Sequence, residues 1–209
     1  MNSLLETRLR AGVSELGLEV TDLQCVLLLE YIELLVKWNK VYNLTAVRDP
    51  ADMVVRHLLD SLAIAPWCTG QRLIDVGTGA GLPGIPLAIL FPHKEIHLLD
   101  SNSKKTRFLF QVKTALALDK LSIHHARVES FEPAARYDVV LSRAFASLLD
   151  MVTGCSHLLC DSGQFIAMKG AVSESELTSV DALGFLPTVH ALSVPGLDEQ
   201  RHLLILSGK

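Results

Sequence analysis

A run of spaced glycines behind a short apolar segment is the feature of this sequence best suited to binding a small molecule. The run reads Asp75-Val76-Gly77-Thr78-Gly79-Ala80-Gly81-Leu82-Pro83-Gly84, and apolar residues flank it on both sides. This order is typical of a strand, a tight turn and a helix. Glycine lacks a Cβ, so the backbone can turn sharply and lie almost against a ligand, and the free N–H groups of the helix start favour polar or anionic groups. We therefore predict a small cofactor bound across the end of this strand.

Two classes of nucleoside cofactor compete for this turn. Residues 79–84 satisfy G-x-G-x-x-G, the dinucleotide fingerprint, whereas residues 75–81 satisfy acid-x-G-x-G-x-G, which resembles the first motif of S-adenosylmethionine (SAM) methyltransferases. Gly77 already stands at the expected strand end, and Asp75 adds a carboxylate there. A carboxylate repels a pyrophosphate and attracts the ammonium group of SAM, so SAM is favoured. A purely structural glycine turn is the third interpretation.

Three further positions follow expected strands and so belong to the same edge of a parallel sheet. Asp100 ends the second strand, where its carboxylate can accept both hydroxyls of a ribose. The Val128-Glu129 backbone follows the third strand and can meet an adenine edge. Arg143 follows the fourth strand and can contact a carboxylate or a phosphate. The alternatives are a helix cap for Asp100 and an ordinary surface salt bridge for Arg143.

From Arg72 onward, short apolar runs alternate with helical stretches. We expect strands at 73–76, 95–99, 121–124, 137–142, 164–169, 188–192 and 202–206, and helices at 84–91, 103–118, 129–135 and 147–159. Repeated strand–helix units predict an α/β, Rossmann-like sheet of seven mostly parallel strands with helices on both faces. The short link between the last two strands favours an antiparallel hairpin at the sheet edge.

Residues 1–67 are predicted to form a helical cap on a cofactor-binding domain of residues 68–209, the two making one compact unit. Thr21 and Gln24 form a capping box, and the helix they open carries an apolar stripe of Leu23, Leu27, Tyr31, Leu34 and Trp38. Asp49-Pro50 supplies an N-cap and a first-position proline for a second helix. This second helix carries Arg56, His57, Asp60 and Ser61.

Composition narrows the class of protein. Hydrophobic residues make up 49% of the 209 residues, so a large core can be buried. There is neither an apolar run of membrane-spanning length nor a secretory signal at the amino terminus, and the four cysteines are expected to be buried, reduced thiols of a cytoplasmic protein. The net charge of −4 does not indicate nucleic-acid binding, yet residues 101–120 hold five cations against one acid, an excess of four. That excess is typical of either a solvated helix face or a phosphate-binding surface.

An ordered set of motifs spans nearly the whole chain. They are Lys37-Trp38-Asn39-Lys40-Val41-Tyr42-Asn43-Leu44-Thr45, Arg56-His57-Leu58-Leu59-Asp60-Ser61, residues 75–86, Leu98-Leu99-Asp100-Ser101, Ser142-Arg143-Ala144-Phe145-Ala146, Lys169-Gly170 and Arg201-His202-Leu203. Together they resemble the bacterial 16S rRNA guanine-N7 methyltransferase family, also called glucose-inhibited division protein B. The resemblance implies SAM as cofactor and the 16S rRNA of the small ribosomal subunit as substrate.

The resemblance also implies site residues. SAM contacts are expected at Gly77, Gly79, Leu82, the Val128-Glu129 backbone and Arg143, with Asp100 assigned from its chemistry. Arg56, Lys169 and Arg201 are candidates for rRNA phosphates, each with a structural ion pair as the alternative. Gln200 stands before Arg201 where the family pattern suggests an acid. His57 has no metal-ligand companion at a suitable spacing, so we expect a packed or hydrogen-bonded histidine and no metal.

Guanine N7 carries a lone pair at neutral pH and can attack a sulfonium methyl without first losing a proton. We therefore expect a direct in-line transfer in which the protein orients the reactants and no side chain acts as a general base. Phe145 or Tyr42 is a candidate to stack on the target base. The alternatives are a nicotinamide-dependent oxidoreductase and a non-catalytic RNA-binding module.

Overall fold

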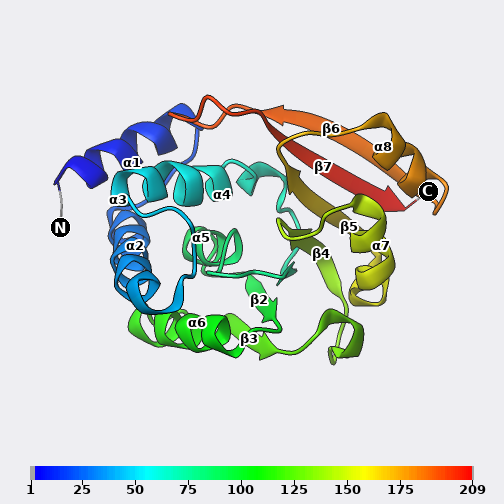
Figure 1. Cartoon of the computed structure of the whole chain (residues 1–209), viewed down its shortest axis with the longest axis horizontal. Helices are drawn as coiled ribbons and strands as arrows, with labels where there is room; N and C mark the ends of the chain where they lie inside the picture. Colours follow the sequence, from blue (N-terminus) through cyan, green and yellow to red (C-terminus); the bar gives the residue numbers. More distant parts are fainter. Residues whose placement is uncertain (1–2, 209) are drawn as a thin grey trace.

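The computed structural model describes residues 3–208, which form a seven-stranded sheet flanked by helices (Figure 1). The strands are β1 (Arg72–Val76), β2 (Glu95–Asp100), β3 (Leu121–His125), β4 (Tyr137–Ser142), β5 (Leu159–Lys169), β6 (Phe185–Leu192) and β7 (Arg201–Gly208). All seven predicted strands are confirmed, and the α/β fold with them. The largest differences are that β5 begins at Leu159 and β6 at Phe185, both earlier than expected.

The strand order is β3-β2-β1-β4-β5-β7-β6. Strands β1 to β5 pair in parallel, β7 runs antiparallel to β5, and β6 runs antiparallel to β7. The predicted hairpin at the sheet edge is therefore confirmed. Because β1 to β4 are parallel and adjacent, their carboxyl ends open onto one edge of the sheet, where ligands bind in folds of this kind.

Helices cover both faces of the sheet. Alternate residues of a strand point to opposite faces, so apolar residues on both sides need a covering layer. Leu73 of β1 belongs to a core shared with the helices that precede and follow this strand, whereas Ile74 belongs to a second core on the other face. The first face is covered by α2 (Asp22–Tyr42), α5 (Gly84–Leu90) and α6 (Ser103–Ala115), and the second by α7 (Leu148–Cys155) and α8 (Glu174–Asp181).

Three helical predictions after β1 need correction. The helix expected at 129–135 is only a 3-10 turn, Val128–Ser130, after which Pro133 interrupts the chain. The helices expected to end at 118 and 159 end at Ala115 and Cys155, the second being followed by a 3-10 turn, Ser156–Leu158. Helix α8 was not predicted, because Val180 is its only fully buried residue and its apolar periodicity is weak.

The N-terminal segment is helical as expected. It contains α1 (Ser3–Glu15), α2, α3 (Pro50–Met53), a π-helical turn η1 (Val54–Leu59), α4 (Asp60–Leu62) and a 3-10 turn η2 (Ala65–Trp67). The capping box of Thr21 and Gln24 is present, and the Asp49 side chain caps α3 by accepting hydrogen bonds from the amides of Ala51 and Asp52. The π-helical turn was not predicted; turns of this kind occur often at functional sites.

The predicted apolar stripe of α2 is partly wrong. Leu23 is 67% exposed, and the most deeply buried leucines are Leu28 and Leu35. The reason is that α1, α3, α5 and α6 all pack on α2, so its buried face is broader than a single stripe and centred elsewhere. The residues of the helical cap and of the sheet share one hydrophobic core, in which Leu28 and Leu58 accompany Leu73.

Cysteine burial follows the prediction with one exception. Cys25, Cys68 and Cys155 are buried free thiols, whereas Cys160 is half-buried and therefore contradicts the expectation that all four are enclosed. No helix within residues 3–208 has the length and apolar character needed to cross a membrane.

Candidate active site

The glycine turn connects β1 to α5 and is fixed by hydrogen bonds to the neighbouring strand. The amides of Gly77 and Thr78 both donate to the carbonyl of Leu99 in β2, at 2.8 and 3.2 Å. Gly77 has a φ of +69°, and a Cβ on it would lie 2.7 Å from the Cβ of Ala144. Both its conformation and its surroundings therefore require glycine at the strand end.

Asp75 lies beneath the turn and holds it from inside. Its side chain is fully buried, and Oδ2 accepts hydrogen bonds from Thr78 Oγ1 at 2.6 Å and from the amide of Gly84 at 2.9 Å. Oδ1 has no hydrogen-bond partner among the described residues. Burial raises the pKa of this carboxyl group to about 6. The expectation that Asp75 offers its carboxylate to a cofactor ammonium needs correction, because its hydrogen bonds anchor the loop and it does not line the cavity.

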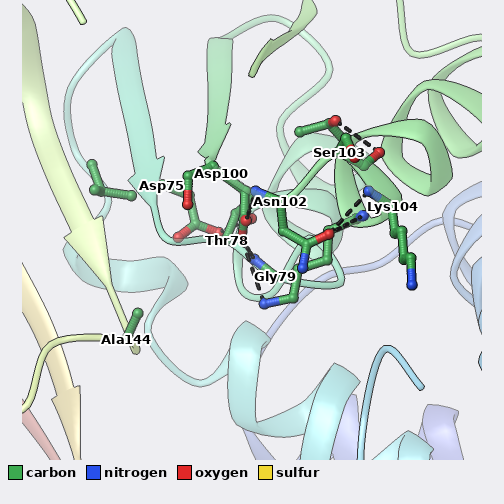
Figure 2. Close-up of polar contacts among 12 residues, drawn as sticks. Asp75, Thr78, Gly79, Asp100, Asn102, Ser103, Lys104 and Ala144 are labelled. Carbon is green, nitrogen blue, oxygen red and sulfur yellow. Dashed lines mark hydrogen bonds and ion pairs between the residues drawn. The ribbon is translucent and has the colours of Figure 1, made fainter. Parts of the chain in front are cut away.

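A cavity of about 320 Å³ opens at the carboxyl ends of β1 to β4. Its lining includes four of the predicted cofactor positions, namely Gly77, Asp100, Val128 and Glu129, and also Phe145, a predicted stacking residue. Figure 2 shows Asp75, Thr78, Gly79 and Asp100 gathered at the strand ends, with Ala144 across the opening. The volume lies within the range of sites for small organic ligands.

Asp100 links the turn to β2. Its Oδ2 accepts a hydrogen bond from the amide of Gly79 at 2.9 Å, and its Oδ1 accepts one from the amide of Asn102 at 2.8 Å (Figure 2). Lys105 Nζ lies 3.7 Å from Oδ2. A carboxylate has about four acceptor positions, so Asp100 keeps acceptor capacity toward the cavity that it lines.

Gly79, Leu82 and Arg143 do not line the cavity. Gly79 acts through Asp100, as described above, and Leu82 is buried behind the turn. Arg143 lies on the loop after β4, where its Nη1 is 3.2 Å from Oδ2 of Asp60. Sequence reasoning missed Lys105 as a lining residue; its position at the start of the helix that follows β2 is the signal that could have identified it.

Asp60 joins Arg143 to a second arginine. Its side chain is 2% exposed, and its Oδ1 lies 3.3 Å from Nε of Arg201. Burial raises the pKa of Asp60, and the two guanidinium groups oppose that rise. Arg201 is also 3.0 Å from Glu199, which in turn pairs with Arg56 at 2.7 Å. An acid next to Arg201 is thus present, at Glu199 and not at position 200 where the family pattern suggests one. The three arginines and two acids form one continuous chain of charges.

The remaining candidates are separate from this chain of charges. Lys169 pairs with Glu176 and donates to the carbonyl of Ala146 at 3.0 Å. His57 is buried and lies 2.9 Å from Thr45 Oγ1 through Nε2, which confirms a packed, hydrogen-bonded histidine. Burial lowers its pKa to about 4. Within residues 3–208 no group of three or more potential metal-ligating side chains is present.

The two aromatic candidates differ. Phe145 lines the cavity, whereas Tyr42 stacks on Trp38 in α2 with ring centroids 5.2 Å apart. Of the two, only Phe145 is in position to contact a ligand in the cavity.

A parallel sheet with a glycine turn after β1, an acid at the end of β2 and a cavity between them defines a Rossmann-like, nucleoside-binding fold. Solved structures of SAM-dependent methyltransferases share this fold. Magnesium protoporphyrin IX methyltransferase from Synechocystis, determined with bound SAH, is 17% identical with a TM-score of 0.60 over 83% of this chain and 93% of its own. The methyltransferase SibL is 13% identical with a TM-score of 0.61 over 86% and 68%. At these identities the likeness shows the fold.

The particular family follows from closer relatives. A family model described as rRNA small subunit methyltransferase G matches residues 24–204, and the chain belongs to this family. The ribosomal RNA small subunit methyltransferase G of Pseudomonas syringae pv. syringae is 51% identical over 198 residues, which cover 95% of this chain and 92% of the relative. The protein of the same name from Shewanella denitrificans is 49% identical and covers 99% of both chains. These matches support a SAM-dependent rRNA methyltransferase and neither alternative considered from the sequence.

Proposed function

We propose that this protein transfers the methyl group of SAM to N7 of a guanosine in 16S rRNA. The substrate is the rRNA within the small ribosomal subunit, and the reaction takes place in the cytoplasm. The observation that carries the proposal is the cavity at the carboxyl ends of β1 to β4, closed from below by a fixed glycine turn. The relatives named rRNA small subunit methyltransferase G support the rRNA substrate.

The donor set around the cavity fits a nucleoside sulfonium. Asp100 offers acceptor oxygens for ribose hydroxyls, and the Val128-Glu129 backbone offers hydrogen-bonding groups for an adenine edge. Gly77 leaves the cavity floor free of a side chain. Arg143 lies on the loop beside Ala144, which lines the cavity, and we assign it to the carboxylate of the amino-acid part of the cofactor. Gly79 and Leu82 contribute by fixing the turn.

Chemistry at N7 makes modest demands on the protein. SAM, when bound, supplies a methyl group on a positively charged sulfur, which an in-plane lone pair can attack. The side chains then need only orient the base, and orientation can be worth about 7–11 kcal/mol of the barrier. We assign Phe145, which lines the cavity, to stacking on the base and on the positive charge that methylation leaves there. We propose that no residue acts as a general base.

At Arg56, Lys169 and Arg201, an rRNA phosphate has to compete with carboxylates of the protein for the positive charge. Each of these cations already pairs with a carboxylate, Glu199 or Glu176. A phosphate at these positions has to displace or share that carboxylate. Their contribution to rRNA affinity is therefore expected to be small relative to that of unpaired cations.

The test is methyl transfer from labelled SAM to 30S subunits, to free 16S rRNA and to 23S rRNA as control. Borohydride and aniline cleave RNA at N7-methylguanosine, so the modified base is located by primer extension. We expect cleavage at a single guanosine of 16S rRNA in the 30S or the free form. Label at another atom, or on no rRNA, contradicts the proposal. A single-turnover rate that stays flat as pH falls toward 5 supports the base-free step, whereas a loss of rate with folding intact contradicts it.

A further inference from the structure

The outward face of α6 carries cations that no acid balances. Lys104, Arg107 and Gln111 are exposed, Phe110 is 51% exposed, and we call these four residues the basic face. Helix α6 contains no aspartate or glutamate. Within residues 3–208 the side chains of Lys104 and Arg107 form neither a hydrogen bond nor an ion pair. Two positive charges therefore point into solvent without a protein partner.

These cations stand where helix electrostatics disfavours them. The amino end of a helix carries partial positive charge, so acids are favoured in its first turn and cations are not. Helices α1, α2, α7 and α8 follow this rule with an acid in the first turn. Helix α6 has Lys104, Lys105 and Arg107 near its start instead. Local stability does not explain this choice of residues, whereas binding of a polyanion does.

The basic face adjoins the cavity. Lys105 is the next residue after Lys104 and lines the cavity, 3.7 Å from Asp100. Figure 2 shows the side chain of Lys104 extending away from the carboxylates of Asp75 and Asp100. The start of α6 therefore presents one lysine inward to the cofactor cavity and one outward, within a single helical turn. A polymer bound at the Lys104 end of the basic face therefore lies next to a residue that lines the cavity.

We propose that the basic face binds the phosphate backbone of the rRNA next to the target guanosine. The inference rests on the proposed function, since it assigns a docking surface to that substrate. Charge complementarity supports an RNA occupant: the chain as a whole has a net charge of −4, and this face is locally positive and unpaired. Arg56, Lys169 and Arg201 are neutralised by carboxylates, so the basic face offers the freer cations. The exposed ring of Phe110 beside Arg107 adds a surface on which a base can stack.

The test compares two double variants with the same loss of charge. Lys104→Gln/Arg107→Gln alters the basic face. Lys120→Gln/Arg136→Gln is the matched control, because these residues directly precede β3 and β4 and so lie at the opposite edge of the sheet. Binding of 16S rRNA and of 30S subunits is measured by filter retention over a series of KCl concentrations, without SAM. Methylation kinetics and SAM affinity by calorimetry are measured separately.

For the basic-face variant we expect roughly tenfold weaker rRNA binding at physiological salt and a logarithmic salt slope shallower by about 1.4–1.8. We expect SAM affinity and kcat unchanged and KM for rRNA raised. The control is expected to match the unaltered protein in all of these. An unchanged slope in the basic-face variant, or an equal change in the control, overturns the inference. Because binding is measured without catalysis, failure of the docking surface is distinguishable from absence of methyl transfer.

Discussion

Replacement of Asp60 by alanine is expected to destabilise the fold more than the loss of any surface ion pair. The carboxylate is 2% exposed and faces Arg143 at 3.2 Å and Arg201 at 3.3 Å. Their side chains are only 28% and 21% exposed, so water compensates poorly for a lost counter-charge. Asp60→Ala leaves two guanidinium groups facing each other across a vacated site.

The size of the stability loss depends on which of the two arginines is left without a carboxylate partner. Removing one member of a buried ion pair costs about 3–5 kcal/mol. Arg201 retains Glu199 at 3.0 Å, whereas no other carboxylate forms an ion pair with Arg143 within the described residues. We therefore expect the lower end, about 3 kcal/mol, which for a domain of this size lowers Tm by about 6–12 °C. Asp60→Asn keeps the volume and an acceptor oxygen and should cost less than the alanine variant.

The assay is urea unfolding followed by circular dichroism, with Asp161→Ala as control because that aspartate pairs only at the surface with Arg136. The control should unfold like the unaltered protein. In a double-mutant cycle, the loss of unfolding free energy for Asp60→Ala with Arg143→Ala should be smaller than the sum of the two single losses. Each single change leaves the other side chain as an unpaired charge, and the double change does not. A loss below about 1 kcal/mol for Asp60→Ala, or strict additivity, refutes this account.

Three other substitutions have defined outcomes. Gly77→Ala should weaken SAM binding at least tenfold by calorimetry, because its Cβ meets Ala144 at 2.7 Å, whereas Gly184→Ala has a comparable φ of +86° in open space and should leave SAM binding unchanged; equal effects contradict the prediction. Burial raises the pKa of Asp75 from 3.8 to about 6, so the folded state holds this proton more tightly and the stability due to this group falls as pH rises through 6. Asp75→Asn should remove that fall in urea titrations from pH 4 to 7, and an unchanged pH profile speaks against it. Burial lowers the pKa of His57 from 6.5 to about 4, so the unfolded state takes the proton first and stability falls as pH drops through this range; His57→Gln should flatten the fall.

The sequence predicted the parts of the site that depend on local order along the chain. Gly77 and Asp100 could be placed because each stands at the end of an apolar strand, and parallel strands bring such ends together. The terminal hairpin could be placed because a link this short joins neighbouring antiparallel strands.

The parts that could not be predicted depend on contacts between distant segments. Asp75 follows the motif of a ligand-facing acid, yet its side chain turns inward because the amide of Gly84 and the hydroxyl of Thr78 lie there. The pairing of Arg143 and Arg201 with Asp60 requires three segments to meet, and no spacing along the chain encodes such a meeting. The π-helical turn η1 likewise has no distinguishing residue pattern, since one extra residue per turn leaves the composition of a helix unaltered.

The hydrogen bond between Arg56 and Glu199 joins residues 143 positions apart in the sequence and links the C-terminal hairpin to the N-terminal helices. A chain still attached to the ribosome has its glycine turn long before strand β7 emerges, and until then it lacks this clasp between Arg56 and Glu199. The chain of charges that links Arg143, Asp60, Arg201, Glu199 and Arg56 is therefore completed only when the last strand has been synthesised, and a product that ends before Glu199 lacks both this clasp and the strand that covers the edge of β5.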